Sequence, residues 1–333
     1  MNDLVPTYSL VVPAYNEEGV LPALAARLTE LMDALDGDAE VILVDDGSSD
    51  RTYELMLEVA RADPRFRLVR LSRNFGHQIA LTAGVDLATG DAVIVLDADL
   101  QDPPEVVLEL AACWREGYDV VYAIRDVRRG ETWFKRKTAA WFYRAFNRIS
   151  EVQVPLDVGD FRLVDRRVLD VFNRMRESNR FVRGMFSWIG LRQTGVLYKR
   201  EERFAGETKY PLRKMLRFAM TGLISFSPAP LRVALRAGFL VSLVSFGFGI
   251  WSLVVKLAGH YVPGWTSILL VVTFIGGVQL IVLGVIGEYI GDIHAEVKAR
   301  PLYVVGELEN FTTMPELPPR AVVARPRALE HRG

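Results

Sequence analysis

Short apolar runs alternate with amphipathic stretches along the first 123 residues. The runs at residues 8–12, 40–44, 66–71, 92–96 and 119–123 have the length of strands. Between them, residues 17–35, 52–62, 77–88 and 104–116 repeat their apolar positions with the period of a helix. This alternation predicts an α/β fold in which a mostly parallel sheet has helices on both faces.

The pattern becomes less regular after residue 124. It predicts a basic, aromatic helix near residues 133–149, a strand at 161–164 and a helix at 166–175. A helix at 211–226 would have an apolar stripe on one face and Arg213, Lys214 and Arg217 on the opposite face. This pattern suits either a helix in the membrane interface or an ordinary packed helix. Residues 301–305, PLYVV, indicate an edge strand or an exchanged strand, and the Pro- and Arg-rich residues 307–333 are predicted to be disordered.

Two long uncharged runs stand out near the C-terminus. Residues 237–255 and 263–287 contain 19 and 25 residues without a charge, and each run is long enough to cross a bilayer as a helix. The short linker at 256–262 makes the pair a hairpin with both ends on one side. Arg232, Arg236, Lys298 and Arg300 flank the hairpin, so the positive-inside rule places those ends in the cytoplasm.

The composition refines this picture. The chain has 333 residues, a net charge of −1 and 50% hydrophobic residues, with one cysteine, Cys113, so no internal disulfide can form. Basic residues nevertheless cluster at 125–148, among aromatic ones, and again at 199–217. In a chain with two apolar spans, these clusters fit an anionic membrane surface or a lipid phosphate better than a nucleic acid. A solvated helix face is the alternative.

Acidic residues follow the buried strand in VIVLDADLQDPPE, residues 93–105. Asp97 and Asp99 would lie at the C-terminal edge of the sheet, where α/β proteins bind ligands. Two carboxylates this close repel each other unless a cation joins them, and Mg²⁺ or Mn²⁺ with substrate phosphates is the usual solution. The alternative is capping of the next helix, which fits Asp102, with Pro103 and Glu105 in the first turn.

Two other strand ends carry candidate nucleotide-binding groups. Pro13 and the polar residues after it could hold a base and a ribose, or Asn16 could simply cap a helix. The carboxylate of Asp46 could accept the N–H edge of a base, whereas an Asp-Gly-Ser turn is the alternative at this position.

The motifs VVPAYNEE, VDDGSSD, LSRNFGHQIALTAG, DADLQDPPE, GDFR and GEYIGDIHAEVKARPLY together resemble one family. In order and spacing they are similar to the family 2 glycosyltransferases that load a sugar onto polyisoprenyl phosphate, such as dolichol-phosphate mannose synthases. Bacterial undecaprenyl-phosphate glucosyltransferases with a two-helix membrane anchor look closest. The resemblance covers residues 8–305. It implies a cytoplasmic GT-A catalytic domain at 1–230, two transmembrane helices at 231–290, and a cytoplasmic helix, short strand and disordered tail at 291–333.

The resemblance also implies roles for individual residues. Those of the donor nucleotide site are Pro13, Tyr15, Glu17, Asp46 and Asp97. The metal motif is formed by Asp97, Asp99 and Gln101. Asp160 matches the candidate catalytic aspartate, as a base or a positioning group, and Asp157 could share its role, while Asp99 also counts among the catalytic residues. A phosphate monoester is largely a dianion at pH 7 and needs no base to attack. The acceptor phosphate would meet Arg200, Arg203 and Lys209.

The implied reaction is the inverting, metal-dependent transfer of one sugar to undecaprenyl or another polyprenyl phosphate at the inner (plasma) membrane, in cell-envelope synthesis. UDP-glucose is the favoured donor. The alternatives are a transferase that uses GDP-mannose or a UDP-N-acetylhexosamine, and a non-catalytic nucleotide-sugar scaffold. The chain lacks the Q-x-x-R-W signature of processive synthases, so a single transfer is expected. A homo-oligomer such as a tetramer is expected, and nucleic acid is not expected as a partner.

Overall fold

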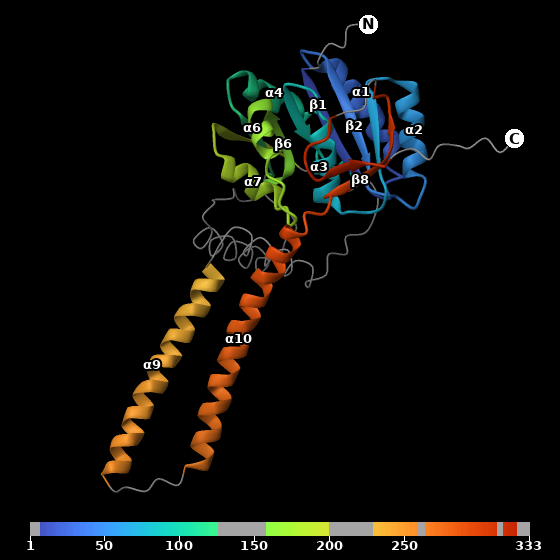
Figure 1. Cartoon of the computed structure of the whole chain (residues 1–333). Coiled ribbons are helices and arrows are strands. Elements are labelled where there is room, and N and C mark those ends of the chain that lie inside the picture. Colours follow the sequence, from blue (N-terminus) through green and yellow to red (C-terminus); the bar gives the residue numbers. More distant parts are fainter. Residues whose placement is uncertain (1–6, 126–157, 200–228, 259–263, 312–315, 325–333) are drawn as a thin grey trace, which may run out of the picture. The chain divides into compact units, whose positions relative to one another are not determined.

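The computed structural model of the chain describes residues 7–125, 158–199, 229–258, 264–311 and 316–324 (Figure 1). The chain divides into two compact units. One comprises residues 1–143, 152–211 and 299–333, and the other comprises residues 144–151 and 212–298. The predicted helices near 133–149 and 211–226 lie outside the described residues, as do Asp157, Arg200, Arg203 and Lys209.

The first unit is built on a nine-stranded sheet in the order β7-β5-β6-β4-β1-β2-β3-β8-β9. Strands β4, β1, β2 and β3 are parallel to one another, β6 runs antiparallel between β4 and β5, and β7 is parallel to β5. At the other side of the sheet, β8 runs antiparallel to β3 and β9 is parallel to β8. The strands are β1 (Tyr8–Ala14), β2 (Ala39–Asp45), β3 (Phe66–Leu71), β4 (Ala92–Val95), β5 (Val120–Arg125), β6 (Val158–Asp165), β7 (Gln193–Tyr198), β8 (Tyr303–Glu309) and β9 (Ala321–Val323).

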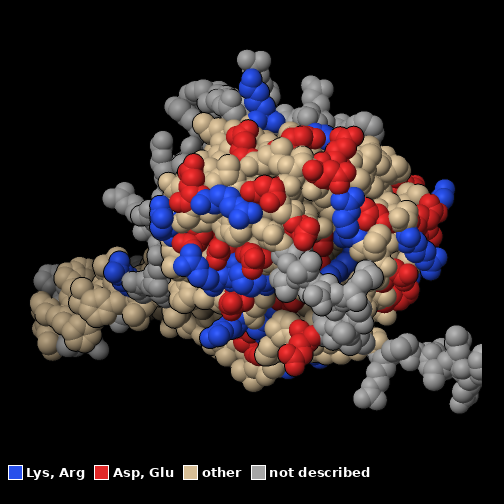
Figure 2. Space-filling view, turned by 90° about the horizontal axis from the view of Figure 1, so that it is seen from above, with Lys and Arg blue, Asp and Glu red and all other residues tan. Residues whose placement is uncertain are grey.

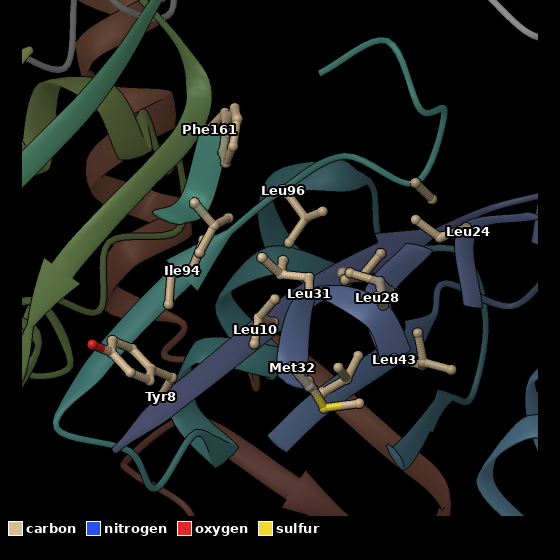
Figure 3. Packing of buried hydrophobic residues seen from close by; sticks show 14 of the residues in the cluster. Tyr8, Leu10, Leu24, Leu28, Leu31, Met32, Leu43, Ile94, Leu96 and Phe161 are labelled. Atoms are coloured by element: carbon tan, nitrogen blue, oxygen red, sulfur yellow. The ribbon is translucent and has the colours of Figure 1, made fainter. Parts of the chain in front are cut away.

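Helices cover both faces of the sheet because successive strand side chains point to opposite sides. On one face, Tyr8 and Leu10 of β1 share a core with Leu24 and Leu28, and all four side chains are buried (Figure 3). The helices of this face are α1 (Leu21–Ala34), α2 (Thr52–Ala62) and α4 (Val106–Arg115). The other face carries α3 (His77–Leu87), α6 (Arg166–Phe172) and α7 (Val182–Ile189). Full burial of each leucine contributes roughly 1.5–3 kcal/mol.

The strands and helices predicted up to residue 123 are all present, with local differences. The sheet is mixed, since β6 and β8 each run antiparallel to a neighbour. The first helix begins at Leu21 instead of residue 17, because a turn in which the N–H of Val20 donates to the carbonyl of Glu17 comes first. Asn16 has a left-handed backbone (φ 56°) and does not cap this helix.

The C-terminal segment is more ordered than the sequence predicts. Strand β8 continues to Glu309 beside β3, and β9 follows at Ala321–Val323, so the predicted disorder from residue 307 is wrong for these residues. The physical reason is burial: Tyr303 and Val305 are fully buried, and the Tyr303 hydroxyl donates to Asp86. Strand β8 pairs with β3 of its own chain and is therefore neither exchanged nor at the edge of the sheet.

The second unit contains two long helices, α9 (Ala229–Leu257) and α10 (Trp265–Val297), which contact each other. Many large apolar side chains on both helices are exposed, including Phe239, Phe246 and Leu280. Within the described residues, one helical stretch, Phe274–Val297, is long and apolar enough to cross a membrane, and a shorter apolar stretch spans Val233–Phe248. Helix α9 extends beyond its predicted uncharged run at both ends, and α10 extends beyond its run at the C-terminal end, to Val297.

Charged residues mix on the face of the molecule seen in Figure 2. Lysine and arginine side chains lie among aspartate and glutamate side chains there, without a broad area of one sign. This distribution agrees with the net charge of −1.

Candidate active site

Side chains from the loop after β4, from strand β6 and from the start of α3 meet at one point. Asp97 follows β4, and Asp160 lies on the neighbouring strand β6. His77 is the first residue of α3, and its Nε2 lies 3.4 Å from both Asp97 Oδ1 and Asp160 Oδ2. The structure thus brings together two of the predicted site residues and adds an imidazole between them.

Besides His77, two side chains hold Asp160. Arg183, in the first turn of α7, donates from Nε to Oδ1 (2.9 Å) and from Nη2 to Oδ2 (3.3 Å), and Gln78 donates from Nε2 to Oδ2 (3.0 Å). Burial alone would raise the pKa of Asp160, but Arg183 and His77 together hold this pKa well below its ordinary value. The carboxylate is therefore an ion-paired anion and a weak base.

A second buried cation supports the backbone beneath Asp160. Arg162, 1% exposed, donates from Nη2 to the carbonyl of Gly159 (2.8 Å) and from Nε to the carbonyl of Asp160 (3.2 Å). Its guanidinium lies 5.0 Å from the ring centroid of Phe186 and 5.3 Å from that of Tyr122. These contacts fix the position from which the Asp160 side chain extends.

Asp97 lies close to three other acidic side chains. Burial raises its pKa to about 6; His77 works in the opposite direction, and the nearby acids Asp160, Asp102 and Asp99 reinforce the rise. Among the described residues, its buried Oδ1 has no hydrogen-bond partner, although His77 lies within ion-pair distance. For His77, burial lowers the pKa, but the two carboxylates outweigh it and raise the value to about 9.

The residues fit a divalent cation that is completed by a substrate. No group of three or more His, Cys, Asp or Glu side chains in the described part of the chain is arranged to hold a metal on its own. The carboxylate of Asp97 has an oxygen to offer, and Asp99 lies two residues further on, half-buried. Asp99 Oδ1 accepts from the N–H of Gln101 (3.2 Å), which orders the turn between them. One or two carboxylates plus substrate phosphates is the usual Mg²⁺ arrangement.

Asp46 connects two loops at the ends of β2 and β3. Its two oxygens accept hydrogen bonds from the N–H of Phe75 (2.7 Å) and the N–H of Gly76 (2.9 Å), and the residue is 2% exposed. Burial raises its pKa, and these backbone donors offset part of the rise. The predicted contact with a base would have to use lone pairs that these two donors leave.

Hydrogen bonds also join the loops that follow β1 and β2. Ser49 N–H donates to Asn16 Oδ1 (2.9 Å), and Glu17 N–H donates to Thr52 Oγ1 (2.8 Å). Pro13 is buried within β1, whereas Tyr15 is 46% exposed just beyond it. The candidate nucleotide site thus combines a rigid strand end with an exposed aromatic ring.

Sequence reasoning missed three residues of this site, namely His77, Gln78 and Arg183. His77 and Gln78 follow the polar end of β3 at the start of α3, so the rule that functional groups gather at carboxyl ends of parallel strands could have found them. Arg183 comes from α7, far along the chain, and its sequence surroundings carry no comparable signal.

The chain is similar in sequence to a family of glycosyltransferases. The model of glycosyl transferase family 2 matches residues 9–172, and that of the GtrB C-terminal hairpin matches residues 229–293. "Uncharacterized glycosyltransferase YkcC" of Bacillus subtilis (strain 168) is 51% identical over 299 residues, which are 90% of this chain and 93% of the relative. The SfII prophage-derived bactoprenol glucosyl transferase of Shigella flexneri is 43% identical, over 89% of this chain and 96% of the relative.

A solved structure resembles the chain more distantly. Glucosyl-3-phosphoglycerate synthase from Mycobacterium tuberculosis, in complex with Mn²⁺, UDP and glucosyl-3-phosphoglycerate, is 22% identical over 66% of this chain and 78% of that one, with a TM-score of 0.42. The two sequence relatives, by contrast, extend over the sheet and the hairpin alike. Because of these relatives and the two matching models, the chain belongs to glycosyltransferase family 2, with a GT-A fold and a GtrB C-terminal hairpin.

Proposed function

We propose that the chain transfers one sugar, in the first instance glucose from UDP-glucose, to polyprenyl phosphate such as undecaprenyl phosphate. The transfer inverts the anomeric carbon, depends on Mg²⁺ or Mn²⁺ and takes place at the cytoplasmic face of the membrane. The relatives named bactoprenol glucosyl transferase support the sugar and the lipid class. GDP-mannose and UDP-N-acetylhexosamines are the rival donors.

The observation that carries this proposal is the meeting of Asp97, Asp160 and His77 at one strand edge of a family 2 domain. A scaffold that only binds nucleotide sugars would have no reason to bury a carboxylate as costly as Asp160 and to pair it with Arg183. The arrangement favours chemistry over storage of the donor.

In this mechanism, Asp97 and Asp99, with Gln101, would hold the cation. When bound, the cation supplies positive charge to the diphosphate that leaves the sugar. Asp160 does not remove a proton, because its pKa is depressed and both its oxygens already accept hydrogen bonds. It instead orients Arg183 and Gln78. The lipid phosphate is largely a dianion at pH 7 and attacks without a base.

The donor nucleotide is assigned to Pro13, Tyr15, Glu17 and Asp46, because these strand ends form one edge with the Asp97 loop. The acceptor phosphate is assigned to Arg200, Arg203 and Lys209, and Asp157 is assigned a share in the role of Asp160. These four residues lie outside the described part of the chain, so their assignment rests on the family motifs.

For the membrane, we propose that α9 and α10 both span the bilayer and that the sheet unit is cytoplasmic. The apolar, largely exposed surfaces of both helices support this. A homo-oligomer, such as a tetramer, is proposed with the hairpin as its contact. Gln279 lines a groove of about 530 Å³ between the two helices, and its polar side chain favours a protein neighbour over lipid.

The test offers the purified protein undecaprenyl phosphate and, in parallel, radiolabelled UDP-glucose, GDP-mannose and UDP-N-acetylglucosamine. Label should enter the organic phase from UDP-glucose, with Mg²⁺ or Mn²⁺ present, and stop when EDTA is added. NMR of the product should show a β-linkage. If label enters from another donor, that sugar takes the place of glucose in the proposal. Folded protein that incorporates no label from any donor would favour the non-catalytic scaffold.

A further inference from the structure

Two arginine side chains outside the candidate active site are buried in the sheet unit. The side chain of Arg176 is 8% exposed, and Arg180 is 6% exposed. Both belong to residues 173–181, which connect α6 to α7. The proposed mechanism uses neither of them. Two guanidinium groups that are this deeply buried need partners for their charge and for their N–H groups.

One buried carboxylate, Asp86 near the end of α3, faces this pair. Its Oδ1 and Oδ2 accept hydrogen bonds from Arg176 Nη1 (2.8 and 2.9 Å), and its Oδ2 also accepts from the Tyr303 hydroxyl (2.7 Å). Burial lowers the pKa of Arg180 to about 10; Arg176 adds to this fall, and Asp86 opposes it. The nearby acid Glu177 is exposed. Within the described residues, Asp86 therefore balances Arg176, and one buried positive charge remains on Arg180.

The nitrogen atoms left over form the same edge in both guanidinium groups. Arg176 uses Nη1 for the carboxylate, and Arg180 Nη1 donates to the carbonyl of Met175 (2.5 Å). In the part of the chain that the structure describes, the Nε and Nη2 atoms of both side chains are buried and have no hydrogen-bond partner. These two atoms form the planar fork that binds two oxygens side by side, as in the pair of Arg183 with Asp160. Leaving such donors buried and unpaired is costly.

A third guanidinium adds positive charge to the same segment. Arg320 donates from Nη1 to the carbonyl of Arg176 (2.5 Å) and from Nη2 to Ser178 Oγ (2.7 Å). Its Nε donates to the carbonyl of Arg300 (3.1 Å). These three acceptors are uncharged. The segment is therefore rich in cations and calls for an anion.

The geometry of the unpaired N–H groups selects the kind of anion. A water molecule accepts at most two hydrogen bonds and carries no charge. A halide ion is a single acceptor centre, and a carboxylate has two oxygens, which are enough for one fork. A tetrahedral oxyanion such as phosphate has four oxygens. It can offer one pair of oxygens to each guanidinium and a negative charge to the unbalanced one.

We propose that Arg176 and Arg180 bind a free tetrahedral oxyanion, inorganic phosphate, through their Nε–Nη2 edges. The site needs neither donor nor acceptor, so it goes beyond the proposed function and does not depend on it. The phosphate of an anionic lipid headgroup has the same chemistry, but the burial of both side chains favours the free ion. Because residues 173–181 lead into α7, which carries Arg183, bound phosphate orders the segment that precedes Arg183.

Equilibrium dialysis of the purified full-length protein against radiolabelled phosphate, with EDTA and without nucleotide, tests the site. Wild type should bind about one phosphate per chain more than Arg180→Met, which keeps an apolar stem but has no N–H group to offer. Arg180→Lys keeps the charge but lacks the fork, and it should bind this phosphate about tenfold more weakly. Arg174→Met, in the same segment but exposed, is the control and should bind as wild type does. Equal binding by wild type and Arg180→Met, or no binding by wild type up to about 10 mM phosphate, would overturn the inference.

Hydrogen exchange locates the ion and separates its two sources. Inorganic phosphate should slow the exchange of amides 173–181 about tenfold in wild type and leave it unchanged in Arg180→Met. Phosphatidylglycerol added to the detergent micelles should have no such effect. Slowing by this lipid and not by free phosphate would overturn the free ion in favour of a headgroup. Equal slowing by phosphate in Arg180→Met would put the ion elsewhere and overturn the site.

Discussion

Arg183 and Asp160 form a two-bond ion pair between the first turn of α7 and β6, with Nε–Oδ1 at 2.9 Å and Nη2–Oδ2 at 3.3 Å. The carboxylate is 6% exposed and the guanidinium 28% exposed. The pair places a cation beside the proposed reaction site and keeps Asp160 ionised. It also ties α7 to β6, together with the stacking of Phe186 of α7 on Phe172 of α6 that holds the same helix.

Arg183→Met should therefore be costly. It leaves a buried carboxylate without its main partner, and we expect the free energy of unfolding to fall by about 3 kcal/mol, with turnover greatly reduced. Denaturant unfolding in detergent measures the first effect. Arg61→Met is the matched control: Arg61 and its partner Glu309 are 66% and 37% exposed, so the loss of this pair should leave the free energy of unfolding nearly unchanged. Equal losses in the two variants would contradict the importance of burial.

Asp99→Asn should remove metal binding without unfolding the protein. The amide keeps the shape of the half-buried side chain but supplies no negative charge to a cation. We expect Mn²⁺ binding in the presence of UDP, followed by electron paramagnetic resonance, to weaken at least tenfold, with turnover lost. Asp91→Asn, an exposed acid before β4, should leave both unchanged. Normal Mn²⁺ binding in Asp99→Asn would remove this residue from the metal site.

Gly47→Ala should destabilise the loops that Asp46 connects. Gly47 has φ +70°, and an added Cβ would lie 2.6 Å from the carbonyl carbon of Arg73, which is backbone and cannot move aside cheaply. We expect a loss of about 2–4 kcal/mol, measured by thermal unfolding. Gly19→Ala is the control, since nothing lies within 4 Å of the added atom. A neutral Gly47→Ala would mean that the loop adopts another backbone.

Asp165 should make stability depend on pH. It caps α6 by accepting from the N–H of Arg167 (2.9 Å) and also accepts from Trp114 Nε1 (2.8 Å). Burial would raise its pKa, but these hydrogen bonds lower it overall. A depressed carboxylate pKa adds stability above the unfolded value of about 3.9, and this contribution disappears as the pH falls through the folded pKa.

The measurement compares wild type with Asp165→Asn, which retains an N-cap acceptor. The difference in unfolding free energy should be about 1 kcal/mol at pH 7 and should shrink as the pH falls below the unfolded value of about 3.9 toward the lower folded pKa. A difference of constant size from pH 7 to pH 3 would show that shape, and not charge, stabilises this position.

The sequence predicted the repeating half of the fold and the position of Asp97 at the end of a buried strand. Buried runs such as residues 92–96 have one structural solution in an α/β sheet, so β4 and the acids after it could be placed. Strand β8 was anticipated, but its partner β3 lies more than 230 residues away, and no local pattern encodes such a pairing. His77 joined the site because α3 starts there, whereas Arg183 reaches Asp160 only because α7 packs against β6.

The pairing of β8 with β3 has a topological consequence. Strands β7 and β8 belong to one sheet, yet both long helices, α9 and α10, lie between them in the chain. A single passage through a bilayer would leave these two strands in different compartments, which one hydrogen-bonded sheet does not allow. The number of crossings between them must be even. If α10 enters the bilayer to the far side, another segment between residues 199 and 302 has to cross as well, and α9 is the apolar helix available for it.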